Sequence, residues 1–79
     1  MRLTPVIAVF DKKTGLFDPP FTVRHNGEAV REFGIVKKNP ETKFGKNPED
    51  FELFQIGNYN DTLGTFENLS QHVHLDSGV

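Results

Sequence analysis

Runs rich in β-branched and aromatic residues predict the strands of this chain. Residues 3–10 form the first such run, and residues 65–69 form a shorter one late in the sequence. Residues 51–59 form the longest run, and both of its alternating faces carry apolar side chains. We therefore expect one face of that strand to pack on a helix and the other on a neighbouring subunit. For residues 70–79 two alternatives stand, a frayed tail or a short strand around 72–75.

Two turns of one pattern connect the predicted strands. Residues 10–17 and 59–66 share the order aromatic residue, four turn residues, glycine, one further residue and phenylalanine. Gly15 and Gly64 close the turns, since glycine readily takes the positive φ that such turns require. The pattern predicts two hairpins with the same five-residue turn, which is common turn chemistry rather than a sign of duplication.

A helix is predicted over residues 27–38. Asn26 is the expected N-cap, and the first turn is acidic while the last is basic, which suits the helix dipole. The helix is expected to stop before Asn39, because the following Pro40 disfavours helical geometry in that residue. Residues 40–50, with two prolines, are expected to form a mobile loop. The residues that share the apolar face at helical spacing are Ala29, Val30, Phe33 and Val36.

These elements predict one α+β domain over residues 1–79, in which a small antiparallel sheet of three to four strands, made of two hairpins, packs with one central helix. A chain of 79 residues builds a small core, and without cysteine it has neither disulfides nor thiolate zinc sites. Self-association is the remaining common source of stability, so a homodimer or higher oligomer is expected. No apolar run is long enough to span a membrane, and the N-terminus lacks the apolar core of a signal peptide, so a cytoplasmic protein is expected.

The net charge of −2 conceals an uneven distribution. All nine basic residues lie at or before Lys46, so residues 1–23 carry +1, residues 24–46 carry +3 and residues 47–79 carry −6. A split of this kind can mark a basic surface for a partner. It can equally mark two halves that attract each other, within a molecule or between subunits. The sequence leaves both interpretations open.

The motifs of catalysis and of cofactor binding are missing. The chain has no nucleophile elbow, no phosphate-binding glycine loop and no helical His-Glu metal pair, so we expect neither an enzyme nor a cofactor. His72 and His74 are two residues apart and would share one face of a strand. His25 is distant in the sequence, so a third ligand is not evident and no metal site is expected.

Residues 42–46 place a phenylalanine between two lysines beside a glycine. Such a segment can stack its ring on an unpaired base while the lysines contact phosphates. The alternative is a phenylalanine anchored in the core with solvated lysines. A net acidic chain is also a poor generic DNA binder, because contacts to the backbone supply most non-specific affinity. The candidate nucleic-acid-binding residues are Arg24, Arg31, Lys37, Lys38, Lys43, Phe44 and Lys46.

Several segments, in order along the chain, resemble the small nonstructural protein of gokushoviruses, the Microviridae branch with small circular single-stranded DNA genomes. They are DKKTGLFDPPF (11–21), GEAVREF (27–33), NPET (39–42), GKNPEDFEL (45–53), GNYND (57–61), GTF (64–66) and QHV (71–73). Each segment is short, and their ordered combination carries the resemblance. Residues 76–79 depart from it, because they lack the basic or apolar finish expected of the family.

The resemblance implies a non-virion phage protein of the bacterial cytoplasm that acts in viral single-stranded DNA replication, by binding single-stranded DNA. It brings no known catalytic or binding residue with it. An alternative function is that of an adaptor or scaffold-like protein, which binds a host replication factor or the viral capsid precursor. The acidic second half and the two apolar faces of residues 51–59 favour this alternative.

Overall fold

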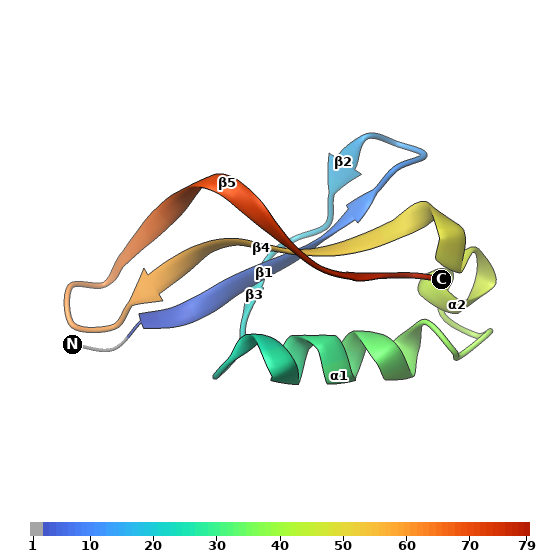
Figure 1. Cartoon of the computed structure of the whole chain (residues 1–79), viewed down its shortest axis with the longest axis horizontal. Coiled ribbons are helices and arrows are strands. Elements are labelled where there is room, and N and C mark those ends of the chain that lie inside the picture. The colour runs from blue at the N-terminus through green and yellow to red at the C-terminus, as the bar shows by residue number, and fades with distance from the viewer. Residues whose placement is uncertain (1–2) are drawn as a thin grey trace.

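A computed structural model describes residues 3–79 and contains a five-stranded antiparallel sheet and one main helix (Figure 1). The predicted α+β class is confirmed, although the sheet has five strands rather than three to four. The strands are β1 (Leu3–Asp11), β2 (Leu16–Phe17), β3 (Phe21–Thr22), β4 (Phe51–Asn60) and β5 (Thr65–Ser77). The helices are α1 (Asn26–Val36), α2 (Lys43–Lys46) and the 3₁₀ helix η1 (Pro48–Asp50).

The strand order is β2-β1-β4-β5, and β3 also pairs with β1. β2 and β3 therefore lie along the same edge of β1, where β2 pairs with Phe10 and Asp11 and β3 pairs with Val6 and Ile7. Two prolines, which donate no backbone hydrogen bond, separate these two short strands. β3 has only two residues after the prolines, so it carries too little periodicity to be recognised in the sequence.

Alternation along β1 and β4 directs one set of side chains toward α1. Val9 pairs with Leu53 and Asp11 with Phe51, so the apolar members of these pairs face the same side of the sheet. The pairing skips Ile56 on β4, because Ile7 pairs with Gln55 and Val6 pairs with Gly57. This β-bulge shifts the alternation of β4 by one residue, so the β4 residues after it still face the same side as their β1 partners. The buried core between sheet and helix consists of Ile7, Val9, Val23, Ala29, Phe33, Phe51 and Leu53.

The N-cap of α1 is His25, so the prediction of Asn26 is wrong by one residue. His25 is extended, and its Nδ1 accepts a hydrogen bond from the Glu28 N–H at 3.3 Å. Asn26 is instead the first helical residue, and its side chain donates to Gln55 Oε1 on β4 at 3.0 Å. The helix ends at Val36, two residues earlier than predicted.

Residues 40–50 form two short helices, α2 and η1, rather than one loop. Thr42 organises this segment, because its hydroxyl donates to the Val36 C=O at 2.8 Å and accepts from the Gly45 N–H at 3.1 Å. The segment thereby folds back against the end of α1. Gly45 also lies against the Asn39 backbone carbonyl, where a Cβ atom has no room.

The two predicted hairpin turns are confirmed, and they have the same geometry. Gly15 has φ 74° and Gly64 has φ 68°, and each N–H bonds at 2.8 Å to the carbonyl of the residue four positions earlier. The side-chain oxygens of Asp11 and Asn60 also accept backbone hydrogen bonds within their turns. An aromatic pair closes each hairpin, with ring centroids 4.8 Å apart for Phe10–Phe17 and 5.3 Å apart for Tyr59–Phe66.

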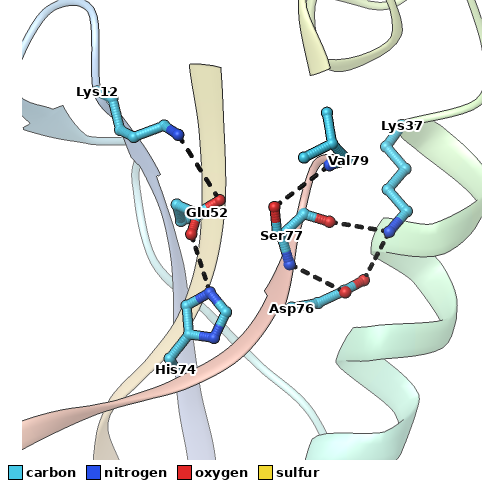
Figure 2. A network of polar contacts seen from close by, with 7 residues as sticks. All are labelled: Lys12, Lys37, Glu52, His74, Asp76, Ser77 and Val79. Atoms are coloured by element: carbon cyan, nitrogen blue, oxygen red, sulfur yellow. Dashed lines mark hydrogen bonds and ion pairs between the residues drawn. The ribbon is translucent and has the colours of Figure 1, made fainter. Parts of the chain in front are cut away.

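β5 continues to Ser77, so the alternative of a frayed tail over residues 70–79 is wrong. The end of this strand is tied to α1 by Lys37, whose Nζ donates to Asp76 Oδ2 and to the Ser77 C=O, both at 2.9 Å (Figure 2). The Gly78 N–H adds a bond to the Phe51 C=O at 2.9 Å. These partners lie far away in the sequence, so local patterns gave no sign of them.

The close approach at Gly45 predicts a specific cost. Replacing Gly45 with alanine places a methyl group against the Asn39 carbonyl, so we expect the free energy of unfolding to fall by roughly 1–3 kcal/mol. The control is Gly34→Ala in α1, where the added methyl group meets no atom and should raise stability by about 0.5–1 kcal/mol. Urea titration of both variants checks this, and equal effects would refute the packing account.

The link between α1 and β5 predicts a measurable coupling energy. Lys37 and Asp76 are only 17% and 26% exposed, so a double-mutant cycle with Lys37→Met and Asp76→Asn should give a coupling of about 1–2 kcal/mol. The Lys43–Asp18 pair serves as the control, since Lys43 is 58% exposed and such pairs contribute about 0.2–1 kcal/mol. A smaller coupling for Lys37–Asp76 than for the control pair would contradict this role.

Candidate nucleic-acid interface

Four of the six predicted phosphate-binding residues are exposed and carry an unengaged positive charge. Arg24 precedes α1, Arg31 lies within it, Lys38 follows it and Lys46 ends α2. Within residues 3–79, no ion pair engages these four side chains. Figure 1 places α2 beyond the C-terminal end of α1, so the four bases follow the length of α1 rather than meet at one point. We call Arg24, Arg31, Lys38 and Lys46 the basic surface.

The other two predicted lysines are already paired. Lys37 Nζ lies 2.9 Å from Asp76 Oδ2, and Lys43 Nζ lies 2.8 Å from Asp18 Oδ2. The pair formed by Lys37 joins the basic and acidic parts of the sequence within one molecule. The attraction between the two parts of the sequence is therefore present within one molecule, while a role of the remaining exposed basic charge in binding a partner stays a prediction.

Phe44 packs with the core. Its ring centroid lies 4.9 Å from that of Phe51 and 6.1 Å from that of Phe33, and both contacts are edge-on. The ring is half-buried, and the Lys43 ammonium lies 5.4 Å from its centroid. This arrangement matches the alternative of a core-anchoring phenylalanine. The turn capped by Thr42 directs Phe44 inward, and that cap is the sequence signal for this placement.

A second surface was only partly visible in the sequence. On the side of the sheet opposite α1, the Phe17 ring lies 4.8 Å from Phe10 and 6.0 Å from Phe54. The two apolar faces of residues 51–59 were its one sequence signal, because its other members come from separate strands. We call this surface the open face, and it contains Phe10, Phe17, Phe54, Tyr59, Phe66, His72 and His74.

The three histidines have separate environments. His25 caps α1, the His72 ring lies 5.3 Å from the Phe17 ring, and His74 Nε2 lies 3.0 Å from Glu52 Oε1 (Figure 2). In the described part of the chain, no three or more His, Cys, Asp or Glu residues are grouped so that they could hold a metal ion. No helix among these residues is long and apolar enough to cross a membrane.

Comparison with known proteins adds one finding to this geometry. No curated protein and no solved structure matches the chain. One family model, described as Phage ORF5 protein, matches residues 4–79 and so covers nearly the whole sequence. The chain therefore belongs to the Phage ORF5 protein family.

Proposed function

We propose that this phage protein acts in the replication of viral single-stranded DNA by binding the single strand through the basic surface. In this proposal the protein is of the gokushovirus type, works in the bacterial cytoplasm and stays out of the virion. Membership of the Phage ORF5 family supports the phage part of the proposal. The resemblance to the nonstructural protein of single-stranded DNA phages supports the nature of the nucleic acid.

The exposed, unpaired bases of the basic surface carry the proposal. Arg31 lies on α1, and Lys38 lies two residues after its end, where the Lys38 N–H bonds to the Ile35 C=O at 3.2 Å. The affinity for a phosphate backbone rises with each arginine or lysine that contacts it, because counterions are released. Lys37 and Lys43 contribute less in this scheme, since each would have to leave a carboxylate.

The same geometry sets the limits of this binding. Phe44 has no base-stacking role in the proposal, because its ring packs against Phe51 in the core. The basic surface also contains acids, since Glu32 is exposed on α1 and Glu28 Oε1 accepts the Arg24 N–H at 3.2 Å. We therefore propose binding that depends on the backbone of the strand, has little sequence preference and weakens steeply with salt. The protein acts as a binding protein and not as an enzyme.

Salt-dependent titration of a labelled oligonucleotide tests the proposal. Replacing Lys38 with glutamine should weaken binding and reduce the slope of log K against log salt by about 0.7, the value for one lost phosphate contact on a single strand. The matched control is Lys13→Gln, which removes an identical charge from the exposed β1–β2 turn and should leave the slope unchanged. Absence of binding at low salt, or equal losses in both variants, would exclude the basic surface as the site.

A second proposal, from a different class, is an adaptor that binds a host replication factor or the viral capsid precursor. The β4–β5 hairpin favours it, because Leu63 is 69% exposed and Phe66 is 67% exposed beside the acidic residues Asp61 and Glu67. An apolar centre with an acidic rim is typical of surfaces that bind proteins.

Retention of purified capsid precursor on the immobilised chain tests the adaptor. Leu63→Lys should weaken retention by about tenfold or more, since it places a charge in the apolar centre. Leu16→Lys is the control, because Leu16 is 67% exposed at the tip of the other hairpin and should not matter. Failure of the unmodified chain to retain the precursor would count against this partner.

A further inference from the structure

The open face has no covering layer within residues 3–79. Figure 1 shows α1 on one side of the sheet only, while α2 and η1 lie beyond one end of it. Phe17 remains 42% exposed and Phe66 67% exposed on the uncovered side. A sheet with aromatic side chains on its solvent side is unusual in an isolated monomer and indicates that another surface covers it.

The open face has two complementary parts. The rings of Phe10, Phe17 and Phe54 cluster where β1 approaches its C-terminal end, with centroids 4.8–6.5 Å apart. Toward the other end of β1, an apolar hollow adjoins the Phe66 ring. Val6, Pro20, Ile56 and Phe66 give it a mainly apolar lining, to which Gly57, Glu67 and two asparagines also contribute. One end of the face therefore presents clustered rings and the other end presents a space that receives apolar groups.

Glu52 is paired on the open face, whereas Glu67 at the hollow accepts a hydrogen bond from Asn60 Nδ2 at 3.3 Å and forms no ion pair among residues 3–79. Glu52 Oε1 lies 3.0 Å from His74 Nε2, and Glu52 Oε2 lies 4.0 Å from Lys12 Nζ (Figure 2). The basic surface, by contrast, follows α1 and α2. A nucleic acid could stack its nucleobases on the rings of the open face. Its phosphates, whose contacts supply most of the affinity, would meet few unpaired lysine or arginine side chains there. An apolar partner suits this face better than a polyanion.

Pairing between sheet edges is disfavoured as a competing arrangement. The two-residue strands β2 and β3 form one edge of the sheet and are too short to pair well with another edge. β5 forms the other edge, and its register against β4 shifts twice, between Leu53 and Phe54 and between Gln55 and Gly57. At the second shift, residues 69–72 of β5 and Ile56 of β4 have no partner in the pairing of these two strands. Bulges of this kind bend an edge strand and block its pairing with another edge. The face, rather than the edge, is therefore the surface that remains for association.

The dimensions of the molecule leave room on the open face for a specific interface. The molecule measures 39 × 23 × 16 Å, and because Figure 1 is viewed along the shortest axis with α1 beneath the sheet, the face spans the longest and shortest extents. These give an upper limit of about 600 Å² (39 × 16) for the projected area of the face, because α2 and η1 add to the longest extent. A biological interface buries at least about 1,000 Å² in total, hence about 500 Å² per partner.

We propose that the open face is covered by the open face of a second copy of this chain, related by a two-fold axis that runs across the strands. Such an axis exchanges the two ends of the face, so the ring cluster of each copy packs on the hollow of the other. Contacts then occur twice by symmetry, as in an isologous interface. The two sheets stack about 10 Å apart, with their strands within about 30° of each other.

The resulting dimer has four layers, with the two sheets inside and the two α1 helices outside. Each outer side then carries one basic surface, so the dimer presents two separate sites for a charged partner. This arrangement uses only contacts between copies and does not depend on the proposal that the chain binds DNA. The two proposals can therefore fail independently.

Sedimentation equilibrium without DNA, over a concentration series, tests the dimer. The unmodified chain should show twice its mass of 8.9 kDa. Phe17→Lys and Phe66→Lys should each raise the dimer Kd by at least about tenfold, since each places a charge in a contact between the ring cluster of one copy and the hollow of the other. Both residues are exposed in one copy, so the variants should keep the circular dichroism spectrum of a folded chain. Ile35→Lys is the control, because Ile35 is 59% exposed on α1 and should leave the Kd unchanged.

Each other outcome overturns the proposal. A monomeric unmodified chain would exclude the dimer. A dimer that survives both phenylalanine variants, or that Ile35→Lys disrupts equally, would place the interface elsewhere. A monomer whose binding to an oligonucleotide is lost in Phe17→Lys and Phe66→Lys, but kept in Ile35→Lys, would show that nucleic acid covers the face instead.

Discussion

One helix is available to cover this sheet, and side-chain alternation determines everything that this helix leaves uncovered. Val9 and Leu53 face the same side of the sheet because they pair with each other, and α1 covers that side. Their neighbours along each strand must then face the opposite side. The β-bulge at Ile56 of β4 keeps paired residues of β1 and β4 on the same side of the sheet beyond it. Aromatic residues at the alternate positions, such as Phe10 and Phe54, therefore cannot enter the core. The open face is a direct consequence of a two-layer fold with apolar residues on both sides of its central strands.

The segment between α1 and β4 closes the covered side and also fixes the role of its lysines. Thr42 ties the segment to the end of α1 and caps α2, which turns Phe44 toward Phe33 and Phe51. Lys43 is then directed to Asp18, while Lys46 stays exposed at the end of α2. Two lysines that look equivalent in the sequence thus acquire different environments, because one cap determines which side of the segment faces the core.

Local patterns predicted the elements whose causes are local. The strands β1 and β4, the helix α1 and both glycine turns follow from periodicity and from turn chemistry within a few residues. The errors have non-local causes. His25 displaces Asn26 as the cap while Asn26 bonds to Gln55 on a distant strand, and β5 extends to Ser77 because Lys37 holds Asp76. For the candidate site, sequence identified the exposed bases but could not separate them from Lys37 and Lys43, since their acids lie far away in the chain.

The uneven charge of the sequence gains a spatial meaning from this fold. Acidic residues after residue 47 pair with basic residues of the first half at Lys37–Asp76 and Lys12–Glu52. The first pair stabilises the end of β5, and the second neutralises Glu52 on the open face. The bases that remain unpaired follow α1, on the other side of the sheet. A surface for a charged partner and a surface for an apolar partner are thus separated by the thickness of one sheet. Because neither surface overlaps the other, self-association and binding of a phosphate backbone are compatible in one small chain.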